Sequence, residues 1–249
     1  MSLFSYAAPQ RFYFLAGKLI PWFAAAAIIT CAIGLWLGFI MAPADFQQGE
    51  VYRIIFIHVP SAWMAMFIYL VMSVYAVLNL GFRTRMSAMM ISALAPTGAL
   101  MAAIALWTGS LWGKPTWGTY WAWDARMTST LILLFLYFGY MALTNAIEDQ
   151  TRADRAGSIL VLVGSVNVPI IYFSVYLWNT LHQGASVSPT GGSKMATIML
   201  MAMLIMTFSA WFYSIAVVLH RARSIILERE SHTQWVQQLV QEQRGKPEV

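Results

Sequence analysis

Six long apolar runs constrain the fold of this chain more than any other feature of its sequence. The runs are Leu19–Met41, Pro60–Leu80, Met86–Trp107, Met127–Ile147, Gly157–Trp178 and Met195–Leu219. The hydrocarbon core of a bilayer is about 30 Å thick, and a helix needs about 20 apolar residues to cross it. Backbone polar groups find no water there, so each run must satisfy them internally as a helix. The sequence therefore predicts an all-α integral membrane protein with six transmembrane helices in a single domain.

The composition agrees with a membrane protein and excludes several other classes. Hydrophobic residues make up 59% of the chain and charged residues 10%, whereas soluble chains carry about 25% charge. The net charge of +5 does not indicate a nucleic-acid partner, because the basic residues are dispersed at the ends of apolar runs. Cys31 is the only cysteine, so neither an intrachain disulfide nor a cysteine-ligated site is expected.

The distribution of Lys and Arg predicts an orientation. One side of the membrane would receive Arg11, Lys18, Arg83, Arg85, Arg152, Arg155, Arg221, Arg223, Arg229, Arg244 and Lys246, and the other only Arg53, Lys114, Arg126 and Lys194. The positive-inside rule then places both termini in the cytoplasm. The outward loops would be Ala42–Val59, Thr108–Arg126 and Asn179–Lys194.

Two further expectations concern helix shape and the end of the chain. Pro96 and Pro169 should kink the third and fifth spans. Residues 220–249 form a polar cytoplasmic tail. Apolar residues at helical spacing in this tail, Trp235, Val236, Leu239 and Val240, fit either a short amphipathic helix or a solvated, frayed segment.

The middle outward loop is unusually rich in tryptophan. Between residues 112 and 124 it contains Trp112, Trp117, Trp121 and Trp123, together with Tyr120. An aromatic belt at the membrane interface needs only one or two such residues per helix end. A dense cluster instead suggests a flat apolar platform for a large planar ligand. Gly113, Pro115 and Gly118 should break regular structure here and bring the backbone close to that ligand.

Two charged residues follow the tryptophans. Asp124 precedes the fourth apolar run and is placed to cap that helix, which does not exclude a role in the site. Arg126 could pair with Asp124 or offer a bidentate grip to a ligand carboxylate. Lys114 and Arg53 are weaker candidates for the same contact.

Two of the four histidines lie in outward loops next to the membrane. His58 stands at the start of the second span and His182 beyond the end of the fifth, whereas His220 and His232 belong to the polar tail. Either outward histidine alone could cap a helix or contact lipid headgroups. Two imidazoles are too few for a typical zinc site, but they suffice as axial ligands of haem iron. With the tryptophan loop between them, we interpret them as iron ligands.

The segment from Trp112 to Asp124 resembles the tryptophan-rich "WWD" signature of haem-handling proteins of cytochrome c maturation. Six spans, a length near 250 residues and one histidine in each flanking outward loop resemble the haem exporter protein C (CcmC) family in particular. This resemblance implies that haem b binds at Trp112, Trp117, Trp121, Trp123, Asp124 and Arg126, with His58 and His182 as axial ligands. It also implies a bacterial inner membrane with the haem site facing the periplasm.

The resemblance further implies a set of partners. Members of the family present haem to the haem chaperone CcmE, and the transporter subunits CcmA and CcmB, with the small protein CcmD, then release the loaded chaperone. This chain contains no GxxxxGK[ST] motif, so ATP hydrolysis would belong to a partner. Membrane lipids are expected to contact the chain, and nucleic acid is not. The chain itself is not expected to be an enzyme.

Three alternatives have different sequence requirements. A transporter for haem or another solute would place polar groups at the bilayer midplane, where Asn167 beside Pro169 is the best candidate. If the chain were only a passive anchoring subunit, the outward tryptophans would have no function. A membrane redox enzyme of the b-type cytochrome kind usually carries its haem ligands inside helices, whereas His58 and His182 lie at the membrane edge.

Overall fold

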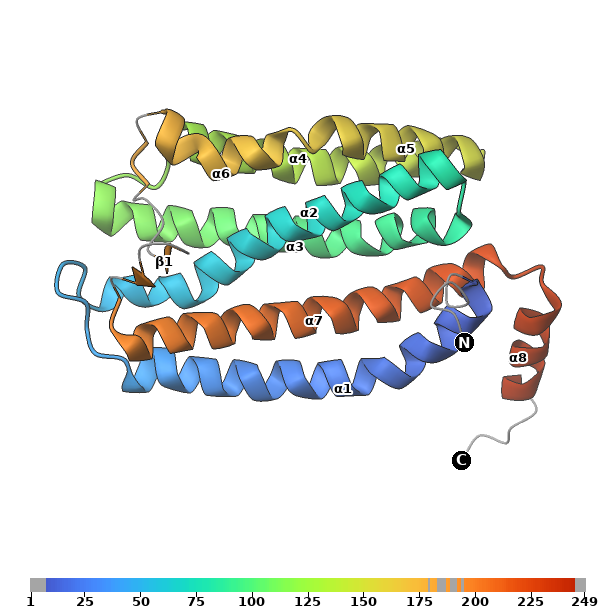
Figure 1. The fold of residues 1–249 in the computed structure, drawn as a ribbon, viewed down its shortest axis with the longest axis horizontal. Helices are drawn as coiled ribbons and strands as arrows, with labels where there is room; N and C mark the ends of the chain where they lie inside the picture. Colours follow the sequence, from blue (N-terminus) through green and yellow to red (C-terminus); the bar gives the residue numbers. More distant parts are fainter. Residues whose placement is uncertain (1–7, 179, 183–186, 189–191, 194, 245–249) are drawn as a thin grey trace.

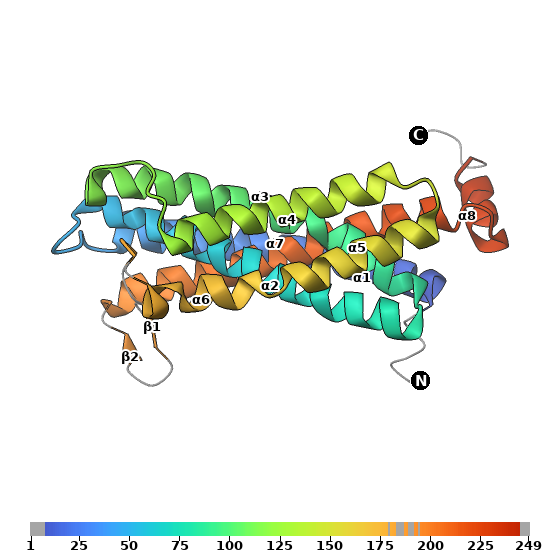
Figure 2. The same ribbon diagram turned by 90° about the horizontal axis from the view of Figure 1, so that it is seen from above.

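The computed structural model describes residues 8–178, 180–182, 187–188, 192–193 and 195–244. Within these residues, six helical segments are long and apolar enough to cross a membrane. They run side by side as one elongated bundle (Figures 1 and 2). The all-α fold with six transmembrane helices is thereby confirmed. Asn179 and Lys194, which bound the third predicted outward loop, lie outside the described residues.

The helices follow the apolar runs and extend beyond most of them. Their bounds are α1 (Pro9–Trp36), a π-helical turn (Leu37–Met41), a 3-10 turn (Glu50–Ile54), α2 (Ile55–Phe82), α3 (Arg85–Trp117), α4 (Ala125–Ala146), α5 (Gln150–Gly164), α6 (Asn167–Leu177), α7 (Thr197–Arg229) and α8 (Gln234–Arg244). Between α6 and α7, β1 (Val187–Ser188) pairs antiparallel with β2 (Gly192–Ser193). The most buried span is α3, while α1 packs mainly on α7 and is the most exposed.

The fifth span consists of two helices, because Pro169 interrupts it. Proline has no amide hydrogen to donate to the carbonyl four residues earlier. That carbonyl belongs to Ser165, which accepts instead from Val168 N at 3.1 Å. Helix α5 accordingly ends at Gly164 and α6 begins at Asn167. The break separates α6 from α2, on which α5 packs closely.

The third span, in contrast, remains a continuous helix through Pro96. Arg221 of α7 donates from Nη1 to the carbonyl of Ala93 at 3.0 Å and to Thr97 Oγ1 at 2.9 Å. These acceptors flank Pro96, where the proline ring weakens the helical ladder. Arg221 therefore supplies a donor at the weakened turn.

The tryptophan segment is more regular than its sequence predicted. Helix α3 continues to Trp117, so Gly113 and Pro115 lie inside it and the predicted break at these two residues is wrong. Pro115 is tolerated because it lies in the last helical turn, where few ladder bonds remain to be lost. Gly118, with φ of 80°, does end the helix, and its amide donates to the Lys114 carbonyl at 3.0 Å.

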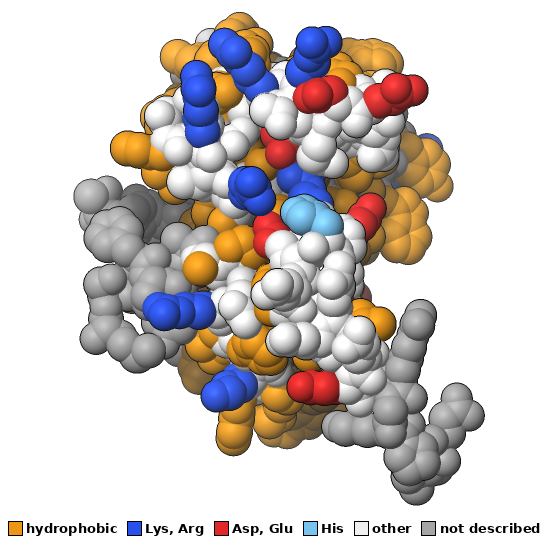
Figure 3. Space-filling view, turned by 90° about the vertical axis from the view of Figure 1, so that its right-hand side faces the viewer, with side chains coloured by type: hydrophobic (Ala, Val, Ile, Leu, Met, Phe, Trp, Pro, Cys, Tyr) orange, Lys and Arg blue, Asp and Glu red, His pale blue; other side chains and the backbone are white. Residues whose placement is uncertain are grey.

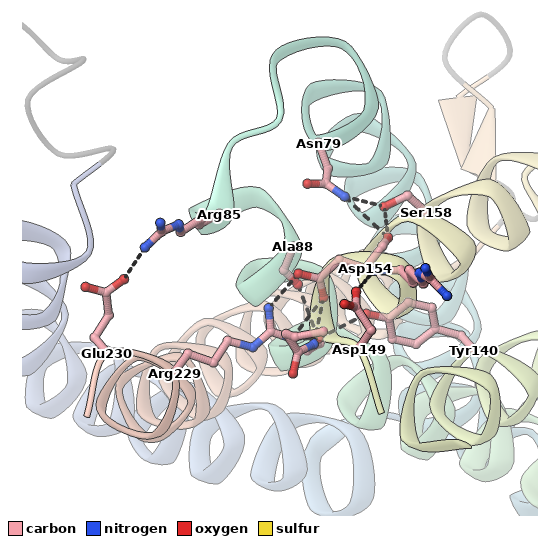
Figure 4. Close-up of polar contacts among 12 residues, drawn as sticks. Asn79, Arg85, Ala88, Tyr140, Asp149, Asp154, Ser158, Arg229 and Glu230 are labelled. Carbon is pink, nitrogen blue, oxygen red and sulfur yellow. Dashed lines mark hydrogen bonds and ion pairs between the residues drawn. The ribbon is translucent and has the colours of Figure 1, made fainter. Parts of the chain in front are cut away.

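The end of the bundle next to α8 carries many of the charged side chains (Figure 3). Arg229 of α7 makes two hydrogen bonds to the carboxylate of Asp154 in α5, at 2.9 and 3.1 Å, and a third to Ser92 of α3 at 3.4 Å. Ser92 in turn contacts the Tyr140 hydroxyl of α4 at 3.0 Å. This polar cluster joins α3, α4, α5 and α7 (Figure 4).

The tail contains an amphipathic helix, as the spacing of its apolar residues allowed. Helix α8 covers Gln234–Arg244. Val236 is buried, and Trp235 packs against Tyr13 of α1 with ring centroids 5.7 Å apart. Of the two interpretations of the tail, the structure therefore favours the helix over the solvated segment.

Candidate functional site

A cavity of about 220 Å³ lies at the end of the bundle opposite α8. Five of the predicted site residues line it: His58 of α2, Trp112 and Trp117 of α3, Arg126 of α4, and His182 beyond α6. The rest of the lining is mainly apolar and comes from α2, α3, α4, α6 and α7. The fold thus brings together two histidines that are far apart in the sequence.

His58 is held against α3 by a hydrogen bond and by close packing. Its Nδ1 lies 3.1 Å from Thr108 Oγ1, and that hydroxyl donates to the Ile104 carbonyl at 2.6 Å. Because the hydroxyl hydrogen is thus engaged, Nδ1 is the donor and Nε2 keeps its lone pair. A Cβ at Gly109 would lie only 2.9 Å from His58 Cε1, so a glycine is needed for this close approach.

His182 has a charged acceptor instead of a hydroxyl. Its Nδ1 lies 3.3 Å from Asp124 Oδ2, so a hydrogen on Nδ1 points to the carboxylate and Nε2 again keeps its lone pair. Burial lowers the pKa of His182 below its ordinary value of 6.5, although the Asp124 carboxylate opposes the shift. At neutral pH the imidazole is therefore uncharged, which is the form that binds metals.

Asp124 has two structural tasks. Its Oδ1 accepts from the Met127 amide at 2.7 Å and caps α4, as its position in the sequence predicted. Its Oδ2 accepts from the Leu181 amide at 3.2 Å as well as facing His182. The same carboxylate therefore fixes the start of α4 and the position of the segment that carries His182.

The four tryptophans divide into two pairs. Trp112 packs edge-on against His58 with centroids 5.7 Å apart, and Trp117 packs against His182 at 4.8 Å. Trp121 and Trp123 do not line the cavity; they contact each other at 5.3 Å, and Trp123 is 77% exposed. The structure therefore brings only the first pair to the histidines.

Arg126 lines the cavity, but much of its guanidinium is engaged by α6. Nε donates to Ser174 Oγ at 3.2 Å, and Nη2 donates to the carbonyls of Ile171 and Tyr172 at 3.4 and 3.3 Å. Among the described residues these bonds use Nε and Nη2, which leaves Nη1 to donate to a ligand carboxylate. The sequence also allowed an ion pair between Arg126 and Asp124. In the part of the chain that the structure describes, the guanidinium bonds to α6 instead.

The two weaker basic candidates are used elsewhere. Arg53 donates from Nη2 to the Ala42 carbonyl at 2.9 Å and also pairs with Glu50. Lys114 donates to the Gly118 carbonyl at 3.2 Å and lies over the ring of Tyr120. Neither residue lines the cavity.

Sequence reasoning missed two residues that hold the site together. The sequence pattern places Thr108 only at the start of an outward loop. In the structure Thr108 precedes Trp112 by one turn of α3 and lies on the same face of that helix. Gln48 accepts a hydrogen bond from Trp112 Nε1 at 2.7 Å. A threonine one turn before the first tryptophan was a usable signal, whereas Gln48 carried none.

The cavity suits part of a large planar ligand that carries metal and carboxylates. The two imidazoles, held through Nδ1, match an iron atom. The apolar wall matches a porphyrin ring, and the guanidinium of Arg126 matches a propionate. Trp121 Nε1 is buried without an acceptor among the described residues. Ligand pockets usually measure about 300–1,000 Å³, so a cavity of about 220 Å³ cannot enclose a whole porphyrin. The fit is therefore to a ring that extends beyond the cavity.

Comparisons with known proteins agree with this picture. The family model described as "Heme exporter protein C" matches residues 2–237. A protein of that name from Bradyrhizobium diazoefficiens is 48% identical over 231 residues, covering 92% of this chain and 87% of the relative. The protein of that name from Escherichia coli strain K12 is 45% identical over 244 residues, 96% of each chain. Another from Paracoccus denitrificans is 42% identical over 230 residues, 92% of this chain and 95% of the relative.

Proposed function

Because the chain belongs to the heme exporter protein C family, we propose that it handles haem during cytochrome c maturation. In this proposal it binds haem b at the cavity, with His58 and His182 as axial ligands, and delivers it to the haem chaperone CcmE. The observation that carries the proposal is the convergence of both imidazoles on one apolar cavity, each with Nδ1 facing an acceptor.

The chain's own residues would orient the cargo and hold it still. Thr108 and Asp124 fix the two imidazole rings, so that both Nε2 atoms remain available to iron. Trp112 and Trp117 support the rings from α3, and Nη1 of Arg126 would meet a propionate. Trp121 and Trp123 lie outside the cavity lining, and they would contact the ring edge that is offered to the recipient.

The remaining parts of the proposal concern place and partners. This multi-pass membrane protein would lie in the bacterial inner membrane with the cavity facing the periplasm, as the distribution of Lys and Arg predicts. CcmA, CcmB and CcmD would complete the assembly and supply ATP hydrolysis. We propose no enzymatic role for this chain.

The transporter alternative finds less support. Asn167, the best candidate for a polar group at the midplane, donates to the Ser129 carbonyl at 2.8 Å and joins α6 to α4. The side-chain amide therefore already has a hydrogen-bond acceptor within the protein and needs no bound solute to satisfy it.

A visible spectrum tests the proposed function. We expect the purified protein to bind haem with a low-spin spectrum, which becomes high-spin or disappears in His58→Ala and in His182→Ala. His220→Ala and His232→Ala serve as matched controls and should keep the spectrum. His220 lies in the part of α7 that leads to α8, and His232 in the turn before α8, at the end of the bundle opposite the cavity (Figure 1). An unchanged spectrum in both cavity variants would remove the axial assignment.

A further inference from the structure

An apolar groove of about 510 Å³ lies between α2 and α6, on the flank of the bundle. On α2 its wall consists of Trp63, Met66, Phe67 and Leu70, which share one face of the helix. On α6 it consists of Val168, Pro169, Tyr172 and Phe173. The groove exists because α6 separates from α2 after the helix break before Pro169.

The groove adjoins the cavity that contains the histidines. Trp63, Met66 and Tyr172 line both. With a rise of about 1.5 Å per residue, the groove runs from about 12 Å to about 22 Å along α2 from its start at Ile55. It therefore reaches from the cavity to roughly the middle of α2.

From this shared wall we infer that haem reaches the two histidines laterally from the bilayer, through the groove between α2 and α6. This inference rests on the proposed haem-binding function. The cavity alone is too small for a porphyrin, and the groove is the adjoining space, with a volume in the range of about 300–1,000 Å³ that ligand pockets have.

The chemistry of the two spaces fits an apolar ring with carboxylates at one edge. The groove wall is almost entirely apolar, which suits a tetrapyrrole and offers nothing to a polar solute. The only guanidinium in the cavity lining belongs to Arg126, and it bonds to the carbonyl of Tyr172, where the two spaces meet. A ring that moves along the groove would thus have its propionates drawn toward Arg126, while its iron approaches the imidazoles.

The test measures how fast haem enters from a membrane. The protein, free of haem, is reconstituted in phosphatidylcholine vesicles, haemin is dissolved in the bilayer, and the low-spin spectrum is followed with time. Leu70→Trp and Phe173→Trp each add an indole to the groove without touching the cavity. These side chains are 45% and 48% exposed, so the larger residue can be accommodated without repacking the core. Leu100→Trp is the matched control, since Leu100 of α3 is 43% exposed and lies in neither space.

We expect both groove variants to load about tenfold more slowly than the unmodified protein, which corresponds to about 1.4 kcal/mol in the barrier. Their final spectra should equal that of the unmodified protein, and Leu100→Trp should load at the unmodified rate. If the groove variants load as fast as the control, or if the control is slowed equally, the lateral route is wrong, and a groove filled only by lipid chains becomes the better account.

The same experiment separates this failure from a failure of the proposed function. If the unmodified protein never acquires a low-spin spectrum, or if His58→Ala acquires it unchanged, haem binding at the histidines is wrong and the route fails with it. If the unmodified protein loads normally and the groove variants match it, only the route is wrong.

Discussion

At the scale of single residues, the two cavity histidines differ in the groups that hold them. His58 relies on a neutral hydroxyl in the neighbouring helix, and His182 on a carboxylate that also caps α4. A partner on Nδ1 fixes the ring and its tautomer, and removing such a partner typically weakens metal binding by 10–100-fold. The two partners can be removed separately, because each acts on one ring only.

Thr108→Val replaces the hydroxyl by a methyl group of the same size. We expect haem affinity to fall by about tenfold or more, because the His58 ring loses the hydroxyl that faces Nδ1. Thr108→Ser should restore most of the affinity. The dissociation constant comes from titration of the Soret band. A purely structural role would instead lower thermal stability in both variants and leave the spectrum of bound haem unchanged.

Asp124→Asn tests the second partner without removing the helix cap, since Asn and Asp cap helices equally well. We expect nearly unchanged thermal stability but haem affinity reduced by about tenfold, because an amide cannot replace the carboxylate opposite His182. Asp149→Asn is the matched control, because Asp149 caps α5 through the Arg152 amide at 2.7 Å. It lies near Arg229, at the end of the bundle opposite the cavity (Figure 4). Equal haem affinity in the two variants would contradict the role of Asp124.

At the scale of helices, the site is built at one end of the bundle and the helices are tied together at the other. The tie is the ion pair between Asp154 of α5 and Arg229 of α7, whose side chains are only 16% and 17% exposed. Removing one partner of a buried pair leaves an uncompensated charge, which is strongly destabilising. A surface pair has no such penalty.

Arg229→Ala should therefore lower the free energy of unfolding by about 3 kcal/mol. Arg152→Ala provides the comparison, because Arg152 of α5 is exposed. Its loss should change the free energy of unfolding by at most about 0.5 kcal/mol. Unfolding of the purified proteins in mixed micelles gives both values. Equal losses would mean that the cluster in Figure 4 does not stabilise the bundle more than an exposed arginine does.

At the scale of the whole molecule, the bundle has two chemically different ends. The cavity lies at one, and α8 with many of the charged side chains lies at the other (Figures 1 and 3). Because the chain has six spans, the last span, α7, ends on the side of the bundle on which α1 begins. The orientation of this axis in the membrane follows from the Lys and Arg distribution and remains a prediction.

Cysteine labelling in whole cells tests that orientation. In a Cys31→Ser background, Phe46→Cys places a thiol at the cavity end, where the native side chain is 99% exposed, and His232→Cys places one at the α8 end. A membrane-impermeant maleimide should label the first in intact cells and the second only after the cells are opened. The reverse pattern would place the cavity in the cytoplasm.

The sequence by itself determined the six helices, because apolar length and the absence of water in hydrocarbon leave the backbone no other solution. It also indicated the cap at Asp124 and five of the residues that line the cavity. These residues lie at helix ends next to the membrane, and such ends gather at a common level. It did not determine which tryptophans face that cavity, because Gly113 and Pro115 suggested a loop where α3 continues.

Only the tertiary structure decided the partners of these residues. His58 and Thr108 are 50 residues apart, and His182 and Asp124 are 58 apart. The hydrogen bonds from Arg126 to α6 likewise depend on how distant helices pack. The same is true of the groove between α6 and α2. Periodicity assigns a residue to a helix and a face, but the neighbour across that face is set by close packing of the whole bundle.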